Sequence, residues 1–67
     1  MKVIVNRTEL EIFRGAKVAD AVRMYFVHHK KALPKTLPIV EDRYGNTVAP
    51  DGALSEGSRL IIKKNNQ

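Results

Sequence analysis

Only one stretch of this 67-residue chain has the hydrophobic spacing of a helix, and strand-like runs lie on both sides of it. After Gly15, apolar side chains recur at steps of three and four residues. They are Val18, Ala21, Val22, Tyr25 and Phe26, with His29 at the next step. This spacing predicts an amphipathic helix of about three turns. Since no second helix is available to cover it, its apolar face must pack on a sheet.

The strand-like runs predict that sheet. Residues 3–5 are all apolar, whereas residues 9–12 alternate between charged and apolar side chains. With a turn near residues 6–8, they predict a hairpin whose first strand is central and whose second strand has one face in water. Three further strands are expected, at residues 39–40, 47–49 and 59–63.

The size and composition of the chain limit what else it can contain. A chain of 67 residues has room for one small core, so we expect a single domain over residues 1–67. It has no cysteine, which excludes disulfides and Cys-based zinc sites. The opening MKVIVN is strand-like and unlike a secretory signal, and no run approaches the roughly 20 apolar residues that cross a bilayer. We therefore expect a cytoplasmic protein without a membrane partner.

Three segments, taken in order, carry a resemblance to a known family. They are MKVIVN, FRGAKVADAV and LSEGSRLIIKK. They resemble the small β-grasp, or ubiquitin-like, proteins typified by the sulphur carriers of thiamin and molybdopterin biosynthesis. The resemblance to the TGS domain of some tRNA synthetases and stringent-response enzymes is more distant. Both imply an α+β fold, in which one helix lies across a mixed sheet of four to five strands with the first and last strands side by side.

The end of the last strand departs from the sulphur-carrier pattern. In that family the strand continues into a tail ending in Gly-Gly, whose terminal carboxylate is adenylated and then converted to a thiocarboxylate. This sequence ends in Asn65, Asn66 and Gln67, and none of its four glycines is next to another. A divergent sulphur carrier is therefore one alternative among several.

The resemblance also implies binding to other macromolecules through the sheet face and the last strand. We accordingly expect a non-enzymatic module that contacts another protein. The candidate contacts on the last strand are Arg59, Lys63 and Lys64. Met24 and Val27 turn away from the apolar stripe of the helix and form a second candidate surface.

A basic patch near the end of the predicted helix favours a second function. The formal net charge is +5 at pH 7, and Arg23, Lys30, Lys31 and Lys35 cluster in this part of the sequence. A TGS-like module could bind RNA or a nucleotide here, with an affinity that falls as salt rises. The other interpretation is an ordinary solvated charged face.

Aromatic residues decide little between these alternatives. Binders of single-stranded nucleic acid usually combine exposed aromatic rings with basic charge. Phe13, Tyr25 and Phe26 are expected in the core, which leaves Tyr44 as the one aromatic side chain expected to be exposed.

His28 and His29 are the most chemically suggestive pair, yet they do not predict a metal site. Adjacent helical residues point about 100° apart, and no third ligand is evident in the sequence. The serines and threonines lack a recognisable base or a Gly-x-Ser-x-Gly turn. We therefore expect no catalytic residues, no cofactor and no bound metal.

Overall fold

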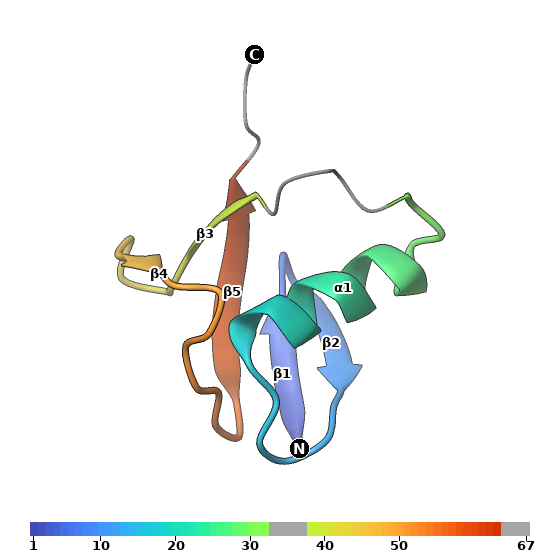
Figure 1. The fold of residues 1–67 in the computed structure, drawn as a ribbon, viewed down its shortest axis with the longest axis horizontal. Coiled ribbons are helices and arrows are strands. Elements are labelled where there is room, and N and C mark those ends of the chain that lie inside the picture. The colour runs from blue at the N-terminus through green and yellow to red at the C-terminus, as the bar shows by residue number, and fades with distance from the viewer. Residues whose placement is uncertain (33–37, 64–67) are drawn as a thin grey trace.

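The computed structural model describes residues 1–32 and 38–63. Its elements are β1 (Lys2–Val5), β2 (Thr8–Glu11), α1 (Val18–His28), β3 (Ile39–Glu41), β4 (Thr47–Val48) and β5 (Ser58–Lys63) (Figure 1). The helix and the strands that the sequence predicts are thus confirmed, and their bounds differ by a residue or two. In the described ranges, no helix is long and apolar enough to cross a membrane.

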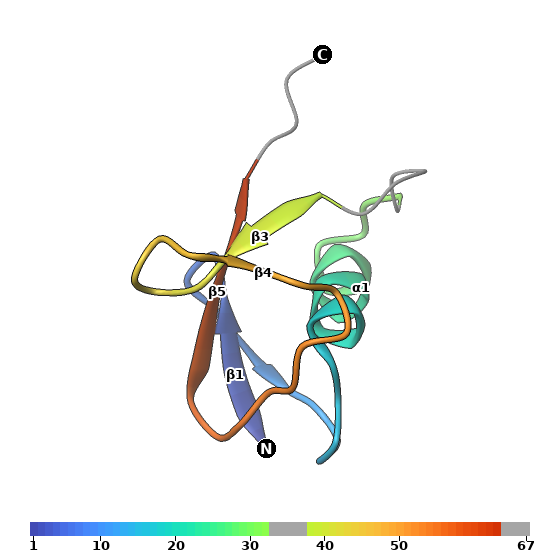
Figure 2. The same cartoon turned by 60° about the vertical axis from the view of Figure 1, so that its left-hand side comes forward.

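The strands form one mixed sheet in the order β2-β1-β5-β3-β4. β1 is antiparallel to β2 and parallel to β5, and β5 is antiparallel to β3. α1 lies across one face of this sheet (Figure 2). One helix on a mixed sheet with the first and last strands adjacent confirms the α+β, β-grasp arrangement. Because β5 is central, a partner can meet it through its open face but cannot pair with its edges.

The core fills the space between α1 and the sheet. Its buried residues are Val3, Val5, Leu10, Ile12, Ala16, Val18, Ala21, Val22, Val40 and Leu60. Tyr25 and Phe26 are partly buried against this cluster, as the helical spacing predicts. Phe13 was expected in the core, and this expectation is wrong, since its side chain is 61% exposed. The preceding Ile12 points inward, and alternation along the extended chain turns Phe13 to the solvent.

The first turn is a tight two-residue connection between β1 and β2. Val5 pairs with Thr8, so Asn6 and Arg7 alone make the turn. Their φ angles are 48° and 71°, and positive values at both positions define the type I′ turn that suits a twisted hairpin. Asn adopts this conformation readily, whereas the second position normally favours Gly. Arg7 therefore occupies a strained backbone position.

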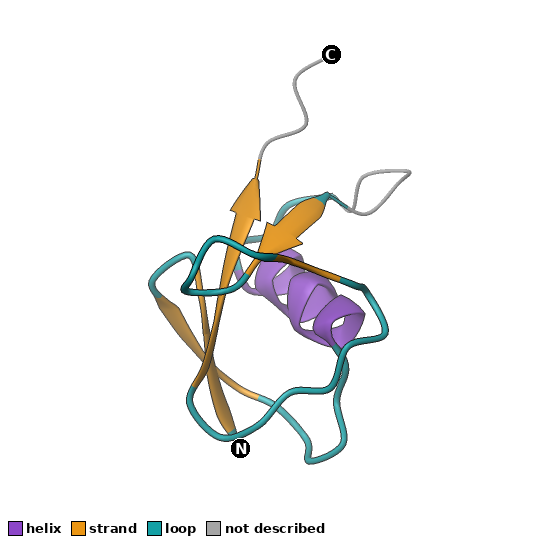
Figure 3. Ribbon diagram, turned by 90° about the vertical axis from the view of Figure 1, so that its left-hand side faces the viewer, coloured by secondary structure: helices purple, strands orange, loops and turns teal. Residues whose placement is uncertain are grey.

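The loop between β4 and β5 passes the start of α1 (Figure 3). The first helical amides, those of Val18 and Ala19, donate to the carbonyls of Gly52 and Pro50 at 3.0 and 2.8 Å. These bonds satisfy donors that have no partner inside the helix. The loop and the helix start therefore stabilise each other.

Candidate functional site

Within the described part of the chain, no helix covers the sheet face opposite α1 (Figure 2). Side chains of β5 alternate between the two faces, so the buried Leu60 points towards α1 and its neighbours Arg59 and Ile61 point away. Ile4 of β1 pairs with Arg59 across the parallel ladder. Ile61 is 43% exposed, which leaves an apolar side chain accessible on this open face.

A depression of about 510 Å³ lies on the sheet at this point. We call it the arginine depression, and it is lined by Ile4, Asn6, Arg7, Arg43, Arg59, Leu60 and Ile61. Three of the seven lining residues are arginines and none is acidic. Ile4 and Ile61 contribute apolar side chains from adjoining strands. The site thus combines positive charge with an aliphatic surface.

The arginines of the depression, Arg7, Arg43 and Arg59, make no ion pair with the described residues. The Arg43 guanidinium carbon lies 5.6 Å from the centroid of the Tyr44 ring, a cation–π contact that leaves its charge in place. All three guanidinium groups can therefore contact an anionic ligand.

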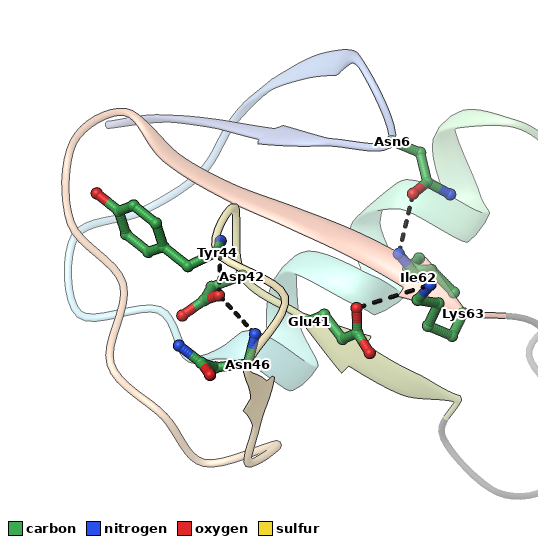
Figure 4. Close-up of polar contacts among 7 residues, drawn as sticks. All are labelled: Asn6, Glu41, Asp42, Tyr44, Asn46, Ile62 and Lys63. Atoms are coloured by element: carbon green, nitrogen blue, oxygen red, sulfur yellow. Dashed lines mark hydrogen bonds and ion pairs between the residues drawn. The ribbon is translucent and has the colours of Figure 1, made fainter.

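Three acidic side chains lie near the depression without lining it, and one of them, Asp42, directly precedes Arg43. Glu41 pairs with Ile61 in the ladder, and its carboxylate lies 3.7 Å from the Lys63 ammonium (Figure 4). Glu9 is opposite Ile4 on β2, towards the edge of the sheet. Glu41 is thus engaged by Lys63 and Asp42 by backbone N–H groups of its own turn, and among the described residues no acid makes an ion pair with an arginine of the depression.

A compact turn between β3 and β4 positions Arg43 and Tyr44. Asp42 Oδ1 accepts hydrogen bonds from the backbone N–H groups of Tyr44 and Asn46, both at 2.9 Å (Figure 4). Gly45 has a φ of 84° and donates from its N–H to the Asp42 carbonyl at 3.1 Å. The turn projects from the sheet on the side away from α1 (Figure 2). Asp42 therefore orders the loop that carries Arg43.

The structure divides the predicted protein-binding residues between two faces. Arg59 lines the arginine depression, and Lys63 lies on the same open face but is paired with Glu41. Met24 and Val27 lie on the outer surface of α1, 37% and 70% exposed. These two groups therefore do not form one surface. Lys64 lies outside the described residues.

Of the seven residues that line the depression, only Arg59 was predicted from the sequence as a binding residue; the six others are Ile4, Asn6, Arg7, Arg43, Leu60 and Ile61. A signal was present at Arg7, because it stands in a two-residue turn where Gly is usual. The isoleucines gave no such signal, since apolar residues in a strand are ordinarily assigned to the core. The pairing of β1 with β5 brings the half-buried Ile4 and the exposed Ile61 to one face of the sheet.

The predicted nucleic-acid residues are also divided. Arg23 donates to Asp20 at 2.9 Å, so part of its charge is neutralised. Lys30 and Lys31 are exposed just beyond the C-terminus of α1. Lys35 lies outside the described residues. At the C-terminal end of α1, the described basic residues without an ion pair are therefore the adjacent Lys30 and Lys31.

The two histidines lie at the same end of α1. His29 Nε2 is 3.1 Å from the Thr8 hydroxyl, and its ring centroid is 4.4 Å from that of Tyr25. The rings of His28 and His29 are 5.1 Å apart. Among the described residues, no three side chains of the metal-binding types gather at one point. His29 instead connects the helix end to the first hairpin.

A second hollow, of about 220 Å³, separates α1 from the β3–β4 hairpin. It is lined by Val18, Ala19, Val22, Pro38, Ile39, Val40, Thr47, Val48 and Pro50. These side chains are apolar apart from one threonine hydroxyl. The hollow lacks a charged group that could select a partner, so the arginine depression is the stronger candidate site.

No protein-family model, curated protein or solved structure matches this chain. The geometry of the arginine depression is therefore the main guide to function.

Proposed function

We propose that this chain is a non-enzymatic, ubiquitin-like β-grasp module that binds another protein through its arginine depression. The observation that carries this proposal is an aliphatic pair, the half-buried Ile4 and the exposed Ile61, bordered by three arginines without ion pairs among the described residues. The proposal assigns no catalytic step to the chain.

The composition of this surface supports a protein partner. Arginine and tyrosine are enriched among the residues that dominate binding energy at protein interfaces. Arg43 lines the depression and is in cation–π contact with Tyr44, which is 77% exposed. A partner that covered Ile61 would remove apolar surface from water, which favours association. The fold supplies a rigid platform because β5 is paired on both edges.

Comparative affinity capture tests this function. Wild-type protein and two variants, Ile61→Asp and Val27→Asp, are used as baits in a native lysate, and the bound proteins are quantified. Both substitutions add one negative charge at an exposed apolar side chain, one on the open sheet face and one on α1. We expect a discrete partner that is lost with Ile61→Asp and retained with Val27→Asp.

The same two variants also show which result would contradict the proposal. Loss of the partner with Val27→Asp alone would place the interface on the helix and overturn the role of the depression. Circular dichroism and urea unfolding of each bait separate a lost interface from a lost fold.

The second candidate function is RNA or nucleotide binding at the basic helix end. The exposed neighbours Lys30 and Lys31 favour it, since neither belongs to an ion pair found among the described residues. In this case a short oligouridylate binds at low salt, and a Lys30→Ala, Lys31→Ala double variant weakens the binding. The Arg59→Ala variant is the control, and equal weakening by it would exclude a site confined to the helix end.

A further inference from the structure

We propose that the arginine depression recognises an acidic protein segment that carries one aliphatic side chain. Carboxylates of the segment pair with Arg7, Arg43 and Arg59, and the aliphatic side chain packs on Ile4 and Ile61. This inference rests on the proposed protein-binding function and specifies the chemistry of the partner.

The charge of the depression selects an acidic partner. Its three arginines come from three separate segments, namely the first turn, the β3–β4 turn and β5. A guanidinium group presents a planar set of N–H donors that matches a carboxylate with two parallel hydrogen bonds. No acid lines the depression, and the nearby Glu41 and Asp42 are engaged by Lys63 and by backbone N–H groups, so the arginines are left to pair with negative charge on a partner.

The aliphatic surface favours a peptide over a nucleic acid. Single-stranded nucleic acids bind chiefly by stacking bases on exposed aromatic rings. Among the described residues that line the depression none is aromatic, while Ile4 and Ile61 are aliphatic, and the Tyr44 ring is already in contact with Arg43. An aliphatic side chain fits this lining better than a base, because it gains burial without needing a ring to stack on.

The conformation of Arg7 provides an independent argument. Its φ of 71° would suit Gly, and a non-glycine residue is strained there. Sequences that depart from local conformational preference often do so at functional sites. The strained turn places the Arg7 side chain at the depression, where its guanidinium group can meet an acid.

Fluorescence anisotropy with designed probes tests the inference on the full chain. The main probe is a short labelled peptide of Asp and Glu residues around one central Leu. Three matched probes replace the Leu by Gly, replace the acids by Lys, or use a short oligouridylate. We expect the acidic Leu peptide to bind best, the Gly peptide to bind several-fold more weakly, and the Lys peptide not to bind.

Variants then assign the binding to the depression. Exposed ion pairs are each worth up to about 1 kcal/mol, so we expect Arg7→Ala, Arg43→Ala and Arg59→Ala each to weaken binding by roughly two- to fivefold. Lys30→Ala and Lys31→Ala remove the same charge at the helix end and are the matched controls. Equal weakening by the lysine and arginine variants would show general charge attraction and overturn the proposal.

Two further outcomes also overturn it. If the Gly and Leu peptides bind equally, the aliphatic contact is wrong. If only the oligouridylate binds, and the arginine variants weaken that binding, the depression is a nucleic-acid site. Failure of every peptide, while captured partners still depend on Ile61, would refute the acidic chemistry and leave the protein-binding function standing.

Discussion

Asn6 Oδ1 accepts a hydrogen bond from the backbone N–H of Ile62 at 2.9 Å, which joins the first turn to the last strand (Figure 4). β1 ends at Val5, so the Asn6 side chain supplies the acceptor that a longer strand would have provided. The Asn6 N–H donates to the Leu60 carbonyl at 3.0 Å, and Nδ2 donates to the Tyr25 hydroxyl at 3.4 Å. One side chain thus links the hairpin, β5 and α1.

We predict that Asn6→Ala lowers the free energy of unfolding by roughly 1–3 kcal/mol, because the Ile62 N–H loses its partner. The φ of 48° adds strain for Ala but not for Gly, so Asn6→Gly should be less damaging. Urea unfolding of both variants measures the difference, and amide exchange should accelerate at Ile62. Wild-type stability of Asn6→Ala would show that this bond adds nothing.

The C-terminus of α1 is a Schellman motif with lysine at the position that favours glycine. Lys30 N–H donates to the Val27 carbonyl at 3.0 Å, and Lys31 N–H donates to the Phe26 carbonyl at 2.8 Å. Lys30 has a φ of 56°, a left-handed conformation in which the side chain of an L-residue is strained.

We predict that Lys30→Gly raises the free energy of unfolding by about 1 kcal/mol, because glycine relieves this strain. Lys31→Gly is the matched control, since Lys31 has no positive φ and should gain nothing. Thermal and urea unfolding of both variants provide the measurement. Equal gains in the two variants would point to relief of charge repulsion in place of backbone strain.

Asp20 should make the stability of the fold depend on pH in the acid range. Hydrogen bonding from the Lys17 N–H, and secondarily from Arg23, lowers the pKa of Asp20 below its ordinary value of 3.8. The fold therefore favours the ionised carboxylate. Its stabilising contribution is present above pH 3.8 and is lost as the pH falls through the lower pKa of the folded state.

We predict that Asp20→Asn removes this part of the acid sensitivity. Unfolding should be compared at neutral pH and well below pH 3.8, the ordinary pKa of the group. Arg23→Met should remove a smaller part, because the backbone N–H of Lys17 is the larger cause of the lowered pKa. Unchanged acid sensitivity in Asp20→Asn would mean that other groups control this transition.

The elements and the first turn follow from local sequence patterns. Val18, Val22 and Tyr25 mark the helix by their spacing, and the alternation around Leu10 marks β2. Phe13 was misassigned because a large apolar residue was given more weight than its place in that alternation. Local rules thus predict the fold where the pattern repeats, and are least reliable at the end of a run.

The arginine depression could not be predicted in this way. Arg7, Arg43 and Arg59 are far apart in the sequence, and only the strand order and the β3–β4 turn bring them to one face. The order of the short strands is set by packing across the whole sheet, which no local pattern contains. Arg59 was identified because it lies on a long strand, whereas the other two arginines lie in turns.

Arg7 gives the sharpest prediction, because stability and binding should change in opposite directions. Arg7 has a positive φ of 71°, and Arg7→Gly relieves the backbone strain at this position. We therefore expect the free energy of unfolding to rise by about 1 kcal/mol. The same substitution removes one of the three guanidinium groups of the depression, so affinity for the acidic Leu peptide should fall by roughly two- to fivefold.

Arg7→Ala is the control that separates the two effects. It removes the charge but keeps a side chain at the strained position, so binding should weaken as in Arg7→Gly while stability stays near the wild-type value. Urea unfolding and peptide anisotropy on the same samples measure both quantities. If Arg7→Gly were less stable than the wild type, the arginine side chain would stabilise the turn. Its presence there would then have a structural explanation instead of a binding role.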